Sequence, residues 1–277
     1  MALAAITFAC IEGPSDGWDN PVALAMLIIG VTSGILFVAV ERSVATPMLP
    51  PALFRARQFT VTNVVTFLVY AALGGVLFLL PVELQVVDHY TPLESGLALM
   101  PLTLIMLLLS ARSGRLATRI GPRLQMSVGP VVIGAGLGLL ARTTTDAAYV
   151  SGTLPAMVVF GLGLAVTVAP LTATALSAAP DEMAGLASAV NNDVARTGGL
   201  LAVAVLPALA GISGSSYLHA SALAGGFRAA VLIAGSWCVI GGIVATAGIR
   251  NPTRRPLSPS EPCPHCALDA TPLSGRT

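Results

Sequence analysis

Long apolar runs, separated by short polar segments, are the main pattern along this chain. Each of seven runs is long enough to cross a membrane, since about 20 helical residues span ~30 Å of hydrocarbon. The run at the start, residues 1–11, is too short to cross and is predicted to be the end of a further transmembrane helix. The pattern therefore predicts seven complete transmembrane helices and a partial N-terminal one. The complete runs cover residues 21–40, 59–81, 94–111, 124–141, 154–176, 188–211 and 227–249.

Composition agrees with this pattern and excludes an ordinary soluble domain. Hydrophobic residues make up 55% of the chain and charged residues 10%, whereas soluble domains carry about 25% charged residues. All 14 basic residues are arginines, and they are spread over many segments and form no single patch. We therefore expect an all-α integral membrane protein with no nucleic-acid partner.

The arginines predict which side of the membrane each polar segment occupies. If the segments alternate between the two sides, one side holds eleven arginines and the other only Arg142, a strong positive-inside signal. This places the C-terminus in the cytoplasm. The start would then lie outside with no signal peptide to carry it there, which favours further helices upstream. The eleven are Arg42, Arg55, Arg57, Arg112, Arg115, Arg119, Arg123, Arg250, Arg254, Arg255 and Arg276.

One arginine-rich stretch, Gly114–Arg123, is predicted to be a tight cytoplasmic loop between two membrane helices. Its glycines allow close helix approach and an unusual backbone dihedral, and its arginines resist translocation. Two interpretations are open: a conformational switch, or a plain positive-inside turn. The candidate switch residues are Gly114, Arg115, Arg119, Gly121 and Arg123.

The order and spacing of several short motifs resemble the C-terminal part of a fourteen-helix drug:proton antiporter of the major facilitator superfamily. The resemblance covers essentially residues 1–273. In that family an acidic residue usually stands where this chain has Thr118, so the resemblance does not extend to an acidic latch here. Besides the arginine-rich loop, the motifs are Glu12-Gly13 with Trp18, Glu41-Arg42 with Pro47, residues 54–59, Leu84-Gln85, Ser95-Gly96-Leu97 with Met100-Pro101, Gly161-Leu162-Gly163 with Pro170, and residues 185–188 with Asn191 and Arg196.

The resemblance implies two six-helix halves that rock about a site at their interface. It predicts proton-coupled export of small amphipathic molecules or drugs across the plasma membrane, with this chain lacking the N-terminal half. Expected partners are a small-molecule substrate, protons, membrane lipid, and either the missing half or a second copy. The alternative is a non-transporting remnant or an interaction subunit. The predicted units are a partial helix (1–11), an extra helix with linker (12–58), a six-helix half (59–249) and a disordered tail (250–277).

Polar residues within or beside the runs are the candidate site residues. Asn191, Asn192, Asp193 and Arg196 lie near the start of one run; Asn192 and Arg196 share a helical face, and Asp193 is within reach of Arg196. They are predicted to line a cavity or gate, as Gln85 is, or else to form an interfacial first turn in which Arg196 reaches the lipid headgroups.

The candidate for proton coupling is Glu83, which follows Pro81 at the outer end of its run. A coupling carboxylate must be shielded from water in order to bind a proton near neutral pH. The alternative is an ordinary interfacial acid.

Two further patterns receive structural interpretations. Gly134 and Gly138 have the spacing of a close helix contact, but chance or ordinary packing is the favoured explanation. Cys263, His265 and Cys266 offer three soft ligands where zinc normally takes four, so we expect no metal and no other cofactor. The sequence contains no phosphate loop, zinc-protease motif or nucleophile triad, and we expect no enzymatic activity.

Overall fold

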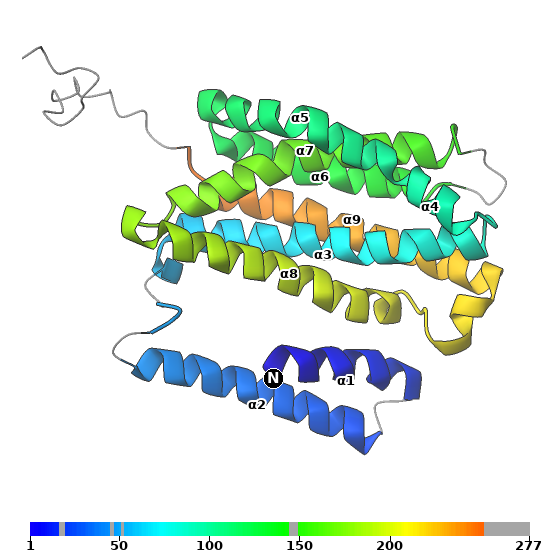
Figure 1. The fold of residues 1–277 in the computed structure, drawn as a ribbon, viewed down its shortest axis with the longest axis horizontal. Coiled ribbons are helices and arrows are strands. Elements are labelled where there is room, and N and C mark those ends of the chain that lie inside the picture. Colours follow the sequence, from blue (N-terminus) through cyan, green and yellow to red (C-terminus); the bar gives the residue numbers. More distant parts are fainter. Residues whose placement is uncertain (17–19, 45–46, 51–52, 144–148, 252–277) are drawn as a thin grey trace, which may run out of the picture.

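The computed structural model describes residues 1–16, 20–44, 47–50, 53–143 and 149–251. Every regular element in these ranges is a helix, as predicted (Figure 1). Three short 3-10 helices, η1 (Leu53–Arg55), η2 (Asp181–Met183) and η3 (Gly214–Leu218), join longer ones. The α-helices are α1 (Ala2–Asp16), α2 (Pro21–Ser43), α3 (Arg57–Val86), α4 (Pro92–Ala98), α5 (Met100–Ile120), α6 (Pro122–Leu140), α7 (Thr153–Ser177), α8 (Ala184–Leu209) and α9 (Ala220–Gly248).

Six of the seven predicted spans are long and apolar enough to cross a membrane: α2, α3, α4 with α5, α6, α7 and α9. The seventh, predicted over 188–211, forms the 26-residue helix α8. This helix is long enough to cross a membrane but is less apolar than the other six. Its first half contains two asparagines, Asp193 and Arg196, which lower its hydropathy. α8 nevertheless lies along α3 inside the same bundle (Figure 1). The chain is therefore a multi-pass helical membrane protein.

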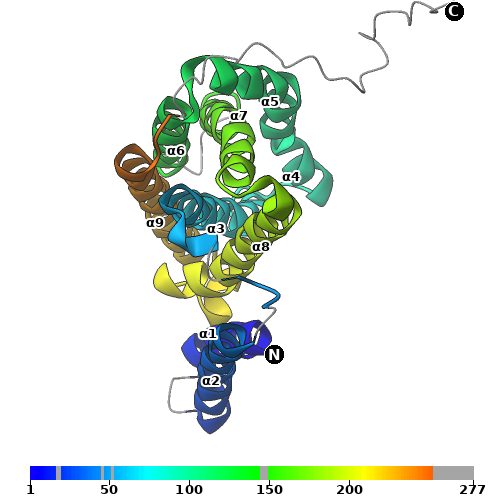
Figure 2. The same cartoon turned by 90° about the vertical axis from the view of Figure 1, so that its left-hand side faces the viewer.

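α3 is the central helix of a bundle formed by α3–α9. It packs against α7, α8 and α9 (Figure 2). Half of the residues in its most apolar 18-residue stretch are buried. α2, in contrast, buries only Ala23 and Gly30, because it packs mainly against α1. The α1–α2 pair lies beside the bundle and contacts it through α1 and α8.

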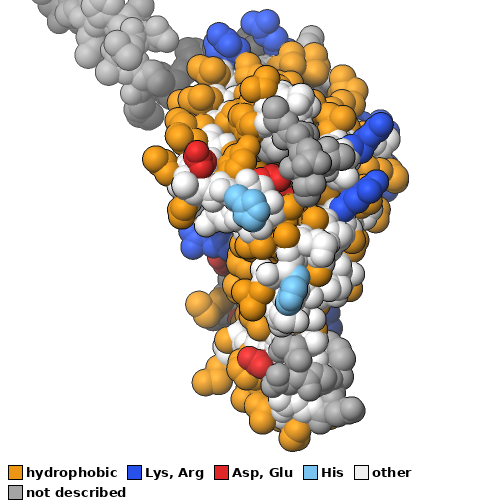
Figure 3. Space-filling model, turned by 90° about the vertical axis from the view of Figure 1, so that its right-hand side faces the viewer, with side chains coloured by type: hydrophobic (Ala, Val, Ile, Leu, Met, Phe, Trp, Pro, Cys, Tyr) orange, Lys and Arg blue, Asp and Glu red, His pale blue; other side chains and the backbone are white. Residues whose placement is uncertain are grey.

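The bundle has two distinct ends. We call the end with η1, Gly121, η2 and Arg250 the junction end, and the end with α4, Thr143 and η3 the pocket end (Figure 1). The pocket end, viewed in Figure 3, shows acidic and histidine side chains scattered among apolar ones, with basic side chains at the edges of the view.

Glycines bring α6 close to two different neighbours. A Cβ on Gly134 would lie 2.9 Å from the carbonyl oxygen of Gly235 in α9, and one on Gly136 would lie 2.6 Å from the backbone nitrogen of Phe160 in α7. Gly138 has open space. Gly134 and Gly138 therefore do not form one contact face, and the favoured interpretation, ordinary packing, agrees with the contact of Gly134.

Several helices end later than predicted. α1 continues through Pro14 to Asp16, so the start of the predicted acidic turn is helical. α3 continues past Pro81 to Val86, which makes Glu83 and Gln85 helical residues.

The predicted span 94–111 is interrupted at Leu99, two residues before Pro101, because proline has no N–H to donate to the preceding turn.

Candidate functional site

The predicted arginine-rich loop is mostly helix, which corrects the prediction. α5 runs to Ile120 and α6 starts at Pro122, so Gly121 alone separates them. Gly121 has φ of +85°, a left-handed conformation that residues with a Cβ rarely adopt, and a Cβ there would clash with the side chain of Asn251. The unusual dihedral predicted for this stretch is confirmed at Gly121.

Arg123 and Asn251 join this turn to the end of α9. The Arg123 guanidinium donates from Nε and Nη2 to the Thr246 carbonyl oxygen, at 3.2 and 2.9 Å. The backbone N–H of Arg123 donates to Asn251 Oδ1 at 3.1 Å, and Asn251 Nδ2 donates to the Ile120 carbonyl at 3.5 Å. Asn251 therefore accepts from the first turn of α6 and donates to the last turn of α5.

The first turn of α3 holds the same end of α9. Arg57 Nη2 donates to the Ala247 carbonyl at 2.9 Å. Gln58 exchanges two hydrogen bonds of 3.2 Å with the backbone of Arg250. The last carbonyls of α9 thus accept from two guanidiniums, which also complement the negative end of the helix dipole. We call Arg57, Gln58, Gly121, Arg123, Thr246, Ala247, Arg250 and Asn251 the junction cluster.

A buried polar bridge lies next to the junction cluster. Gln125 Nε2 donates to the carbonyl oxygen and the hydroxyl of Ser113, at 3.1 and 3.2 Å, and the Ser113 hydroxyl donates to the Val166 carbonyl in α7 at 3.2 Å. These bonds connect α5, α6 and α7. Gln125 Oε1 is buried and accepts no hydrogen bond from the described residues.

The other predicted switch residues, Gly114, Arg115 and Arg119, lie on α5. Gly114 faces α7, where a Cβ would lie at an ordinary 3.7 Å from Ala169. Arg115 and Arg119 are exposed on α5 and line a shallow hollow with Arg112. Thr118, at the position of the family's acidic residue, donates its hydroxyl to the Arg115 carbonyl.

The predicted polar patch of α8 is divided between two faces, which corrects its treatment as one cavity lining. Asn191 is buried, and its Nδ2 donates to Asn63 Oδ1 at 3.1 Å and to Thr66 Oγ1 at 2.8 Å, both in α3. Asn192, Asp193 and Arg196 are exposed. Asn192 and Arg196 share a face as predicted, but the described contacts include no ion pair between Asp193 and Arg196.

Gln85 lies far from this patch. It is exposed at the pocket end of α3, where its Nε2 donates to the Pro81 carbonyl of its own helix at 3.0 Å. Asn63 precedes Gln85 by 22 residues, which corresponds to about 33 Å along a helix. Gln85 and Asn191 therefore do not share a site.

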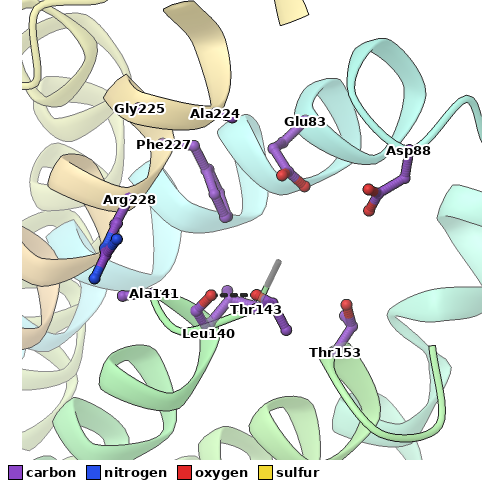
Figure 4. Close-up of a pocket in the computed structure, with 10 residues that line it drawn as sticks. All are labelled: Glu83, Asp88, Leu140, Ala141, Thr143, Thr153, Ala224, Gly225, Phe227 and Arg228. Atoms are coloured by element: carbon purple, nitrogen blue, oxygen red, sulfur yellow. Dashed lines mark hydrogen bonds between the residues drawn. The ribbon is translucent and has the colours of Figure 1, made fainter. Parts of the chain in front are cut away.

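Glu83 faces a cavity of about 280 Å³ at the pocket end, between α3, α6, α7 and α9 (Figure 4). Asp88 lines the same cavity, because the chain reverses after α3 at His89, whose φ is +56°. In this turn the N–H of Tyr90 donates to the Leu84 carbonyl at 2.9 Å. The other lining residues are Leu140, Ala141, Thr143, Thr153, Ala224, Gly225, Phe227 and Arg228.

Asp88 has an unusual environment for a carboxylate. Burial raises the pKa of Asp88, and the nearby His89 partly offsets this rise. The sequence interpretation singled out Glu83 alone and missed Asp88, Thr153 and Arg228. Only Asp88 gave any signal, as a second acid five positions after Glu83 in a segment without arginine.

Cys263, His265 and Cys266 lie outside the described residues, as does everything after Asn251. Arg250 and Asn251, predicted to begin the tail, are hydrogen-bonded members of the junction cluster.

The chain is similar to several antibiotic resistance proteins. It is 33% identical over 219 residues to the puromycin resistance protein of Streptomyces alboniger, covering 78% of this chain and 43% of that protein. It is 30% identical to a methylenomycin A resistance protein of Streptomyces coelicolor, over 92% of this chain and 52% of that protein. It is 31% identical to the tetracenomycin C resistance and export protein of Streptomyces glaucescens, over 75% of this chain and 38% of that protein.

The chain spans about half or less of the length of these curated relatives. Residues 17–204 match the sequence profile of the Major Facilitator Superfamily, a region that includes α2 to α7 and most of α8. The helical bundle, its apolar spans and these matches agree with one another. The chain therefore belongs to the major facilitator superfamily.

Proposed function

We propose that this chain is the C-terminal part of a transporter that exports small amphipathic molecules in exchange for protons. The observation that carries the proposal is the similarity, over three quarters or more of the chain, to proteins named for antibiotic resistance, one of which is also named for export. The relatives are about twice as long, so the proposal is that a further helical half completes the transporter. That half is either an upstream segment or a second copy of this chain.

The proposed organisation keeps the predicted units: residues 59–249 as a six-helix half, 12–58 as an extra helix with its linker, 1–11 as part of a preceding span, and 250–277 as a tail. We place the junction end in the cytoplasm of a plasma-membrane protein. Arginines support this side: Arg57, Arg123 and Arg250 lie in the junction cluster, and the positive-inside tendency keeps arginine-rich ends in the cytoplasm.

The site residues have different proposed roles. Asn192, Asp193 and Arg196 line the interface with the missing half, because charged side chains on an exposed face of a membrane helix require a cavity or a partner. Gly121 and Arg123 act in the conformational switch through the end of α9. Glu83 takes up the coupling proton, since it is partly shielded at the edge of a cavity. We propose transport without enzymatic chemistry and without a cofactor.

Export of a fluorescent cationic dye tests this proposal. Cells express either this chain or the same reading frame extended upstream, and dye efflux is recorded with and without an ionophore that collapses the proton gradient. We expect ionophore-sensitive efflux from the extended protein, and from the short chain only if two copies assemble. Absence of efflux from both, with both proteins present in the membrane, would instead support a non-transporting remnant or interaction subunit.

Two variants of the extended protein test the coupling role. Glu83→Gln is expected to abolish ionophore-sensitive efflux, because a glutamine cannot bind and release the proton. Glu182→Gln, on exposed η2 at the junction end, is the matched control and should transport normally. Full efflux from Glu83→Gln would assign proton coupling to another residue.

A further inference from the structure

The cavity at the pocket end has two carboxylates and two hydroxyls among its described lining residues. Glu83 and Asp88 both direct their carboxylates into it (Figure 4). Nothing in the described ranges forms an ion pair or hydrogen bond with either carboxylate. Two carboxylates this close together repel each other, and a bound cation relieves the repulsion.

Two threonines on the opposite wall add neutral acceptors. Thr153, the first residue of α7, is 8% exposed and points into the cavity, yet its hydroxyl bonds to none of the described residues (Figure 4). Its hydroxyl is therefore free to bond to a ligand in the cavity. Thr143 donates its hydroxyl to the Leu140 carbonyl, so its oxygen lone pairs remain available.

The charge balance of the cavity also favours a cation. Arg228 is the one basic residue among its described lining residues, and Phe227 lies between Arg228 and the carboxylates in Figure 4. With both carboxylates ionised, the described lining residues carry two negative charges and one positive charge, which leaves one net negative charge. A monovalent cation therefore complements the lining, and the aromatic ring beside the acids offers an apolar contact for its carbon skeleton.

Size restricts the ligand further. A cavity of about 280 Å³ corresponds to the volume of about nine water molecules, at ~30 Å³ each. This is close to the lower end of the usual range for ligand pockets, so the cavity suits a small molecule of about ten non-hydrogen atoms.

We propose that this cavity is a binding site for a small protonated amine, whose ammonium N–H groups donate to Glu83, Asp88 and the hydroxyl of Thr153. An ammonium group has three donors and no acceptor, which matches two carboxylates and the hydroxyl oxygen of Thr153. The site lies within this bundle and uses none of the exposed α8 residues proposed to face the missing half. It shares Glu83 with the proposed proton coupling. Amine binding to the purified chain nevertheless needs neither a proton gradient nor the missing half, so it is tested separately from transport.

Equilibrium dialysis of the purified full chain in mild detergent, with radiolabelled 2-phenylethylammonium as the probe, tests the site. Binding is expected for this amine and not for 2-phenylethanol, which has the same skeleton without charge. Phenyltrimethylammonium, which keeps the charge but has no N–H donor, should bind at least about tenfold more weakly, because charge-assisted hydrogen bonds are lost. Equal binding of amine and alcohol would overturn the proposal.

Variants locate the site and separate charge from shape. Glu83→Gln and Asp88→Asn are each expected to weaken amine binding at least about tenfold, since each removes a charge-assisted acceptor. Glu182→Gln at the other end should bind as the unaltered chain does. Unchanged affinity in both Glu83→Gln and Asp88→Asn would refute the site.

A steric variant controls for misfolding. Gly225 lines the cavity, and a Cβ there would meet nothing within 4 Å, so Gly225→Leu fills the cavity without a backbone clash. We expect it to lose amine binding and to keep the unfolding temperature of the unaltered chain. Gly185→Leu is the matched control, because Gly185 also has open space but lies in the first turn of α8 at the junction end. Retained binding in Gly225→Leu would contradict the assignment.

Discussion

The two ends of the α3–α9 bundle use their polar side chains in opposite ways. At the junction end, Arg57, Gln58, Arg123 and Asn251 each bond to a helix other than their own or to the segment that follows α9. At the pocket end, Glu83 and Asp88 face a cavity with no bonded partner in the described ranges. The first arrangement fixes helices to one another, and the second leaves polar groups ready for a ligand or a proton. Stability is therefore expected to depend on the junction end and binding on the pocket end.

The largest expected effect is at Gly121. Gly121→Ala places a side chain in a left-handed conformation and against Asn251, which should cost about 2 kcal/mol or more. Thermal unfolding in detergent measures this loss. Gly114→Ala is the control, since its Cβ has room beside Ala169 and alanine favours the helix. Equal stability of the two variants would show that Gly121 is not essential to the junction.

A smaller loss is expected inside the bundle near the same end. Asn191→Leu removes the donor to Asn63 and Thr66, and interhelical hydrogen bonds in membrane proteins contribute about 1 kcal/mol. Asn192→Leu, at the exposed neighbour, should leave the unfolding temperature nearly unchanged. If Asn192→Leu were the more destabilising of the two, the assignment of Asn191 to the α3–α8 contact would be wrong.

The guanidinium contacts are expected to contribute less. Arg123→Gln loses the bonds to the Thr246 carbonyl and one charge at the end of α9, worth about 0.5 kcal/mol at an exposed position. Arg115→Gln, one helix earlier and exposed, is the matched control. Chemical denaturation of both variants distinguishes them, and equal stability of the two would show that the Arg123 guanidinium does not stabilise the junction cluster.

The smallest effect on stability is expected at the pocket end, and it should depend on pH. Burial raises the pKa of Asp88 in the folded chain above its value in the unfolded chain. The contribution of Asp88 to the free energy of unfolding is therefore most favourable below the unfolded pKa of about 3.9, and it is lost as pH rises through the folded pKa. Asp88→Asn removes this loss. The unfolding temperature of the variant, measured relative to that of the unaltered chain, should therefore increase as pH rises from 4 to 7. Asp181→Asn serves as the control, and a constant difference across this range would argue against burial of Asp88.

The helical membrane fold could be predicted from the sequence because apolar runs of about 20 residues are the length that a membrane-spanning helix requires. It also predicted the special dihedral near Gly121, since a glycine between two helices has few other uses. The arginine-rich stretch was harder, because arginines were taken as a loop signal. Arg112, Arg115 and Arg119 are spaced by three and four residues, which is equally the pattern of an exposed helical face.

Most of the site could not be predicted, for a physical reason. Asn191 and Asn192 are identical in chemistry and adjacent in sequence, and only the rotation of α8 against α3 decides which is buried. Asn251 and Thr246 are common polar residues at a helix end, with no periodic pattern to mark them. Asp88 joins Glu83 only because the chain reverses at His89, and a residue other than glycine seldom adopts the positive φ that this reversal uses.

The bonds between Gln58 and Arg250 also carry a consequence for biosynthesis. These residues are 192 positions apart, so at about 5–20 residues per second the ribosome needs roughly 10–40 s to make the second after the first. Throughout that interval the start of α3 has been synthesised without the partners that hold it in the finished bundle. Closure of this end must therefore be among the last steps of assembly, after translation of α9 is complete.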